Sequence, residues 1–104
     1  LRSARAFYYQ SIEAAWAVAE RGDKVNVDQR RDIRLATTHA VEASIKTVDA
    51  MYTLGGGSAV YADSPLQRHF RDVHMTSQHI MVAPSTLETV GRLYLRVEAQ
   101  TSTL

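Results

Sequence analysis

The sequence predicts an all-α protein, folded as an up-and-down bundle of four helices. Apolar residues recur at steps of three and four along most of the chain, as on one face of a helix. Alanine, the best helix former, occurs fourteen times. Most segments lack the alternation of apolar and polar residues that marks a strand. The chain has 104 residues, which is enough for one domain and too few for two.

The first two helices are expected at about 1–20 and 29–54. An apolar face predicts the first helix and comprises Leu1, Ala4, Tyr8, Ile12, Ala15 and Ala19. Gly22 predicts its end. Asp28 is the expected N-cap of the second helix, which would be about 39 Å long at ~1.5 Å per residue.

The second helix is expected to be amphipathic. Its buried face comprises Ile33, Thr37, Ala40, Val41, Ser44, Val48, Met51 and Tyr52. The opposite face, which we expect in solvent, comprises Arg31, Arg34, Thr38, Glu42, Asp49 and Thr53. Gly55–Gly57 ends this helix and lets the backbone approach a neighbour or a ligand closely.

A third helix is predicted from Ser64 to the residue before Pro84. Ser64 is the expected N-cap, Pro65 lies in the first turn, and Gln67 can complete a capping box. Proline cannot continue a helix, so Pro84 is the expected end.

A fourth helix is predicted from about Ser85 to Ala99, with a second possible capping box between Ser85 and Glu88. The residues expected to face inward are Leu87, Val90, Tyr94 and Val97. Gly91 would lie in mid-helix at a cost of ~1 kcal/mol, which favours close packing against another helix.

Composition excludes several classes of function. Twelve Lys and Arg against eleven Asp and Glu give a net charge of +1, which predicts no nucleic-acid partner. The absence of cysteine excludes disulfides, cysteine-ligated metals and thiol nucleophiles, and it is compatible with the cytoplasmic location that we expect. No apolar run approaches the roughly 20 residues that span a bilayer, so no membrane partner is expected. Leu1 opens directly inside a helical pattern, so residues 1–104 are expected to be a piece of a longer chain.

Chemistry is most plausible in the segment Val73–Leu87, which has no Asp, Glu, Lys or Arg. It carries His74, Gln78 and His79, and an uncharged helix with such side chains should be buried or lie under another chain. The residues alone leave two interpretations open: hydrogen bonding within the bundle, or a functional polar patch. The two histidines are five residues apart, roughly 140° around a helix, so no metal site is expected.

A longer motif surrounds this segment. The pair Gly56-Gly57 is followed after eight residues by Pro65, and Arg71-Asp72 begins six residues beyond that proline. This spacing resembles the C-terminal helical domain of the acyl-CoA dehydrogenase superfamily. More closely, it resembles the flavin-dependent monooxygenase branch, the oxygenase components of two-component aromatic hydroxylases.

The position of His79 distinguishes the branches. Acyl-CoA dehydrogenases typically carry a Tyr-Glu-Gly-Thr-like stretch there, whose Glu is the catalytic base, whereas this chain has His79-Ile-Met-Val82. The monooxygenase branch carries Arg-Asp-x-His and a second histidine five residues later. Here these residues are Arg71, Asp72, His74 and His79.

The resemblance implies a function and a set of site residues. His79 would be the catalytic histidine near the flavin C4a position, with His74 and Gln78 in the substrate or flavin pocket. The residues that would approach flavin or a subunit interface are Gly55, Gly56, Gly57 and Ser58. Reduced flavin (FMNH2 or FADH2) would come from a separate reductase and react with O2 through a flavin C4a-hydroperoxide. The substrate would be an aromatic or polycyclic small molecule.

The resemblance also implies a C-terminal domain that assembles as a homotetramer and is inactive without the rest of its chain. Two alternatives stay open. One is an acyl-CoA dehydrogenase or oxidase whose base lies elsewhere, and the other is a non-catalytic oligomerisation bundle.

Overall fold

The computed structural model of this chain describes residues 1–102 and 104. It contains four α-helices, α1 (Arg2–Glu20), α2 (Val27–Leu54), α3 (Pro65–Thr76) and α4 (Ser85–Tyr94). Two short 3-10 helices, η1 (Gly56–Val60) and η2 (Ile80–Val82), follow α2 and α3. No strand occurs in the described part of the chain, so the predicted all-α class is confirmed.

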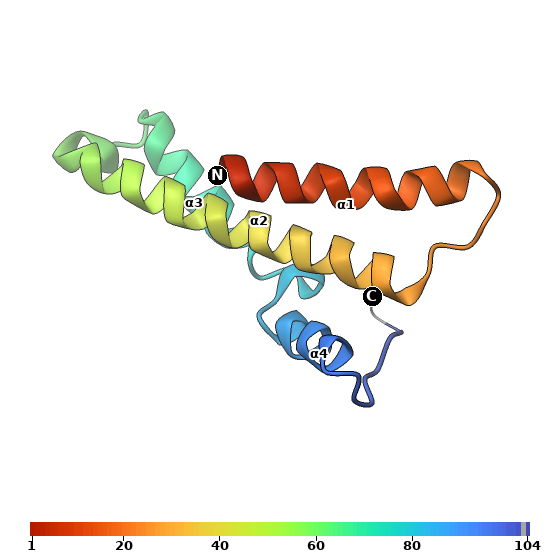
Figure 1. The fold of residues 1–104 in the computed structure, drawn as a ribbon. Helices are drawn as coiled ribbons and strands as arrows, with labels where there is room; N and C mark the ends of the chain where they lie inside the picture. Colours follow the sequence, from red (N-terminus) through yellow and green to blue (C-terminus); the bar gives the residue numbers. More distant parts are fainter. Residues whose placement is uncertain (103) are drawn as a thin grey trace.

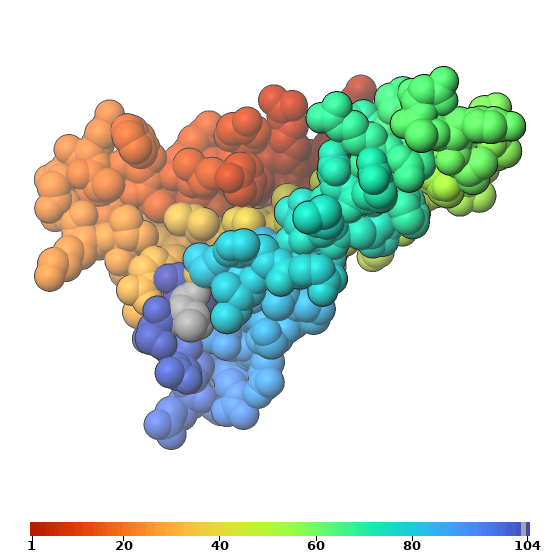
Figure 2. All heavy atoms as spheres, turned by 180° about the vertical axis from the view of Figure 1, so that it is seen from behind, coloured from red at the N-terminus to blue at the C-terminus, as the bar shows by residue number. Residues whose placement is uncertain are grey.

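Helix α2 is the central element of the fold. Figure 1 shows α1 running antiparallel beside it, α3 near its C-terminal end and α4 on another side of its N-terminal half. The bundle is therefore open, and Figure 2 shows α4 and the described part of the C-terminal tail projecting from one side of the molecule. The radius of gyration is 16.7 Å, against about 13 Å for a compact chain of this length.

The ends of α1 and α2 depend on local hydrogen bonds. Gly22 closes α1 with a φ of +80°, as predicted, and its N–H donates to the Ala19 carbonyl. The N-cap of α2 is Asn26 and not Asp28. The Asn26 side chain accepts from the N–H of Gln29 at 2.9 Å, and the Gln29 side chain accepts in return from the N–H of Asn26 at 3.1 Å. This reciprocal capping box starts α2 earlier than expected.

Helix α3 ends at Thr76, well before Pro84. The Ser77 hydroxyl donates to the carbonyl of His74 at 2.7 Å, and His79 already has an extended backbone, with ψ of 130°. Ser64 lies at the N-cap of α3, but its side chain makes no capping hydrogen bond. The expected long third helix is therefore a shorter helix followed by a turn and η2.

Helix α4 also ends earlier than expected. Arg96 has a φ of 55°, and the N–H of Val97 donates to the carbonyl of Arg92 at 3.1 Å, which closes the helix after Tyr94. Of the side chains expected to face inward only Val90 is buried, at 3% exposure. A Cβ on Gly91 would meet nothing within 4 Å, so the predicted helix packing at this glycine is wrong within the described chain.

Helix α4 is attached to α2 by a polar cluster. The Arg31 guanidinium lies 4.0 Å from the centroid of the Tyr94 ring, and the Tyr94 hydroxyl donates to Asp32 at 3.0 Å. Burial raises the pKa of Tyr94, and the hydrogen bond to Asp32 raises it further. The cluster joins the two helices through a cation–π contact and a hydrogen bond.

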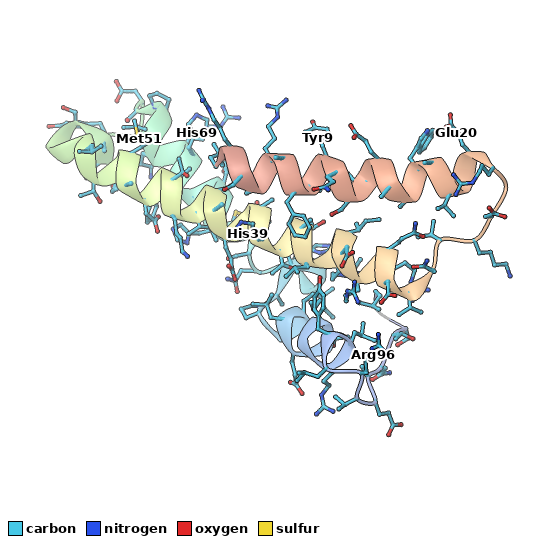
Figure 3. All side chains as sticks on the ribbon, viewed as in Figure 1. Tyr9, Glu20, His39, Met51, His69 and Arg96 are labelled. Atoms are coloured by element: carbon cyan, nitrogen blue, oxygen red, sulfur yellow. The ribbon has the colours of Figure 1, made fainter. Side chains whose placement is uncertain are left out.

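Small side chains dominate the core. Its buried apolar residues are Ala4, Ala15, Ala36, Ala59, Val82 and Val90. Larger apolar side chains remain outside, including Trp16 at 65% exposure. Figure 3 shows Tyr9 and Glu20 pointing away from α2 on the outer side of α1. Exposed apolar surface of this extent is typical of a face that packs against further protein.

Within the described residues, no helix has both the length and the apolar character needed to cross a membrane.

Candidate active site

His79 lies in the turn between α3 and η2, where its side chain caps η2. Its Nδ1 accepts a hydrogen bond from the backbone N–H of Met81 at 3.2 Å. A ring nitrogen that accepts a hydrogen bond carries no proton, so the neutral ring holds its proton on Nε2. The side chain is exposed. The turn therefore presents an imidazole Nε2–H toward the outside of this chain.

Arg34 on α2 anchors the residue that holds His79. Its Nη1 donates to the Met81 carbonyl at 2.9 Å. Arg34 is only 7% exposed, although it belongs to the face of α2 that we expected in solvent. Burial lowers its pKa from a value so high that the guanidinium stays charged at neutral pH. Thr38 on the same face is also buried, because η2 and α4 cover this side of α2.

His74 lies within a contact between α3 and α2. Its Nε2 is 2.9 Å from Oδ1 of Asp49, another residue that we expected in solvent. The His74 ring packs on Phe70, and Phe70 packs on Tyr52, each pair with ring centroids 4.6 Å apart. The ring is half-buried. His74 therefore has an interhelical partner, which corresponds to the first of the two open interpretations.

Gln78 and His74 are connected through the turn that ends α3. Gln78 Nε2 donates to the Ser77 hydroxyl oxygen at 3.1 Å, and that hydroxyl donates to the His74 carbonyl. Gln78 is exposed, like His79 beside it. His74 thus lies in the last turn of α3, and Gln78 and His79 lie in the turn that follows it.

The glycine turn lies beyond the other end of α3, a helix about 18 Å long at ~1.5 Å per residue, and Figure 1 shows it at the far end of α2. A Cβ on Gly55 would lie 2.7 Å from Cδ1 of Leu66, so this glycine lets α3 approach α2. Gly56 has a φ of +54°, a conformation that favours glycine. A Cβ on Gly57 would meet nothing within 4 Å, and Ser58 is exposed. Gly57 and Ser58 therefore face open space within the described chain.

Exposed apolar side chains lie near His79 along the chain, beside the exposed Gln78. Met75 is 72% exposed, Ile80 75% and Met81 43%. Figure 2 shows the segment of residues 75–83 on the surface of this face of the molecule. An apolar rim around an imidazole becomes a dry pocket only when another surface covers it.

The other histidines lie apart from this segment. His39 on α2 and His69 on α3 are both exposed, and Figure 3 shows them on their helices. Among the described residues, no three His, Cys, Asp or Glu side chains lie close enough together to hold a metal ion.

Comparison with known proteins identifies the family. The family model described as "Acyl-CoA dehydrogenase, C-terminal domain" matches residues 1–84, which include the glycine turn and His79. The chain belongs to the acyl-CoA dehydrogenase C-terminal domain family. This agrees with the resemblance seen in the sequence motif.

Three relatives of this domain carry the names of oxygenases. The chain is 37% identical to indole-3-acetate monooxygenase of Pseudomonas putida over 94 residues. This match covers 90% of this chain and 24% of the relative. It is 30% identical to indole-3-acetate monooxygenase of Acinetobacter baumannii, over 86% of this chain and 23% of the relative. It is 31% identical to the pigment production hydroxylase of Rhodococcus erythropolis, over 84% of this chain and 22% of the relative. The chain thus spans about a quarter of the length of these relatives.

A solved structure shows the same fold. The crystal structure of 3-HSA hydroxylase from Rhodococcus sp. RHA1 superposes with a TM-score of 0.78 at 22% identity, covering 99% of this chain and 30% of that one. The open arrangement of the helices is therefore a known fold of a longer hydroxylase chain.

Proposed function

We propose that this chain is the C-terminal domain of a flavin-dependent monooxygenase that hydroxylates an aromatic or polycyclic small molecule. The observation that carries the proposal is the uncharged stretch 79–82, which begins with His79 and has Ile80 where the Tyr-Glu-Gly-Thr-like stretch of acyl-CoA dehydrogenases has its carboxylate base. Relatives with the names indole-3-acetate monooxygenase and pigment production hydroxylase support the same branch.

The residues present fit a reduced flavin as the cofactor, whether FMNH2 or FADH2. When bound, reduced flavin supplies the two electrons with which one oxygen atom of O2 becomes water while the other enters the substrate. His79 would contribute a hydrogen-bond donor at Nε2, because Nδ1 accepts from the Met81 N–H. The neutral ring keeps this proton, because releasing it would leave an imidazolate, so its contribution is a hydrogen bond to an oxygen atom that gains negative charge during the reaction.

The rest of the pocket would come from residues near His79 and from other parts of the protein. We propose that His74 and Gln78 border the substrate or flavin, and that Gly57 and Ser58 face flavin or a subunit interface together with Gly55 and Gly56. The exposed apolar rim of Met75, Ile80 and Met81 would exclude water once it is covered. Assembly as a homotetramer and a separate flavin reductase belong to the same proposal.

The second candidate is an acyl-CoA dehydrogenase or oxidase. The matched family carries this name, which is the observation that favours it. Such an enzyme needs a carboxylate base, and the stretch 79–82 supplies none. The base would have to lie on a different helix.

The test is turnover of the full-length protein with reduced flavin, O2 and a panel of phenols and indoles. We expect hydroxylated product, and we expect His79→Ala to lower the product formed per reduced flavin by about 10²-fold, as for loss of one preorganised hydrogen-bond donor. His69→Ala, which removes an exposed histidine on α3, is the matched control and should leave this ratio unchanged.

Two outcomes would contradict the proposal. Unchanged product per reduced flavin in His79→Ala removes the role of this histidine. Reduction of the bound flavin by an acyl-CoA, without hydroxylation of any aromatic compound, supports the second candidate.

A further inference from the structure

We infer that Arg34 is a positioning residue for His79, which it fixes through the backbone of Met81. The inference rests on the proposed role of His79 and adds a residue from α2, a helix distant in sequence from the histidine. It concerns how the imidazole is held in one tautomer and one orientation.

The contact runs through a single residue. Arg34 Nη1 donates to the Met81 carbonyl at 2.9 Å, and the Met81 N–H donates to His79 Nδ1 at 3.2 Å. Met81 is therefore held on one side by α2 and itself holds the histidine on the other. The N–H of Val82 donates to the His79 carbonyl at 2.9 Å and closes the same turn.

The length of η2 makes this anchor important. It has three residues, and a 3-10 helix this short has few internal hydrogen bonds to keep it in place. The side chain of Met81 is 43% exposed and the side chain of Ile80 is 75% exposed, so neither fixes the turn by burial in this chain. Val82 is buried, and the hydrogen bond from Arg34 joins η2 to α2.

The chemistry of arginine suits this task. Arg34 is 7% exposed, and a buried cation is stable only with hydrogen-bond acceptors around it. A charge-assisted hydrogen bond to a carbonyl is stronger than a neutral one, and the planar guanidinium directs it. Arg34 therefore fixes the Met81 backbone more firmly than a neutral side chain would.

The consequence for His79 is the choice of tautomer. While the Met81 N–H points at Nδ1, the neutral imidazole keeps its proton on Nε2. If Met81 shifts, Nδ1 loses its donor, both tautomers become accessible and the ring can rotate. His79 would then present a proton donor at Nε2 only part of the time.

The experiment uses the full-length protein and two readouts. The first is product formed per reduced flavin in Arg34→Met and Arg34→Lys. The second is the 15N NMR spectrum of histidine-labelled protein, in which His79 is assigned by its absence in His79→Ala and the two nitrogens report the tautomer.

Arg30→Met is the matched control. Arg30 lies one turn earlier on α2, and its Nη2 donates to the carbonyl of Thr101 at 2.7 Å. The control therefore removes the same type of side chain and the same type of hydrogen bond, but the carbonyl belongs to the C-terminal tail and not to η2.

We expect Arg34→Met to lower product per reduced flavin by about tenfold or more, as for a small misplacement of a reacting group, and to give a mixture of His79 tautomers. Arg30→Met should change neither readout. In the His79→Ala background, Arg34→Met should have no further effect on product per reduced flavin, because the two residues act as one unit.

Several results would overturn the inference. One is a single Nε2–H tautomer of His79 in Arg34→Met. Another is a loss of product per reduced flavin in Arg34→Met that adds in full to the loss in His79→Ala. If Arg34→Met does not fold, Arg34→Lys tests the inference. Lysine keeps the positive charge but lacks the planar guanidinium that directs the hydrogen bond to the Met81 carbonyl. A single His79 tautomer in Arg34→Lys would contradict the inference. If His79→Ala leaves the product ratio unchanged, the proposed function of His79 fails, while the 15N spectra still decide whether Arg34 sets the tautomer.

Discussion

The α1–α2 pair and the segment from α3 to α4 are built in different ways. In the pair, two long helices lie side by side over small buried residues such as Ala4, Ala15 and Ala36, and capping hydrogen bonds define their ends. In the segment, short helices alternate with turns, and each makes at least one polar contact with α2. The candidate catalytic histidine lies in the segment, where the helix stops. The regular pair thus supports an irregular segment whose turn positions the His79 side chain.

This division makes a first prediction about packing, with the largest expected effect on stability. Ala36 is 0% exposed on α2, so Ala36→Leu would insert a larger side chain where no space exists. We expect the free energy of unfolding to fall by about 1–3 kcal/mol, the usual cost of overpacking. Urea unfolding of the full-length protein, followed by hydrogen exchange of α1 and α2, measures the loss.

The control for this substitution is Ala62→Leu, at an exposed position of the loop before α3. It adds the same group and should leave the urea midpoint unchanged. If both variants lose the same free energy of unfolding, the loss in Ala36→Leu does not come from overpacking between α1 and α2.

A smaller effect is expected where the segment attaches to α2 through His74. Asp49→Asn keeps an acceptor for His74 Nε2 but removes the charge, and both side chains are more than a third exposed. Solvent screens such a pair, so the loss of stability should be about 0.5–1 kcal/mol. Hydrogen exchange of the α3 amides in the full-length protein would show faster opening.

Asp72→Asn is the matched control for this pair. Asp72 lies 3.6 Å from Arg68 on the outer side of α3, and both side chains are more exposed than those of the Asp49–His74 pair. If Asp49→Asn and Asp72→Asn have the same effect, the contact between α2 and α3 contributes no more than a surface ion pair.

The same contrast explains which features could be predicted from the sequence. The course of α1, its end at Gly22 and the C-terminal limit of α2 follow from periodicity and glycine, and the structure confirms them. The end of α3 could not be predicted, because Pro84 is the strongest breaker in the sequence and the hydrogen bond from Ser77 to His74 leaves no comparable signal.

The site was predictable only in part. The motif around His79 identified the family, but Arg34, which bonds Met81, and Asp49, which bonds His74, are charged and were expected in solvent. A helix covered on two sides breaks the rule that charged residues mark its exposed face. The buried state of Arg34 depends on a contact with η2, which is 47 residues away and has no local signature.

A gain of stability, where the other substitutions cause a loss, is expected at Gly91 and tests whether α4 stays open in the whole protein. Gly91 lies inside α4, and a Cβ there would meet nothing within 4 Å. If the face stays open, Gly91→Ala should stabilise the protein by up to about 1 kcal/mol, because alanine loses less conformational freedom than glycine in a helix. The urea midpoint of the full-length protein measures the change. A decrease in place of the increase would mean that another part of the protein packs against Gly91, as its position in mid-helix first suggested, and that α4 is covered like the α1–α2 pair.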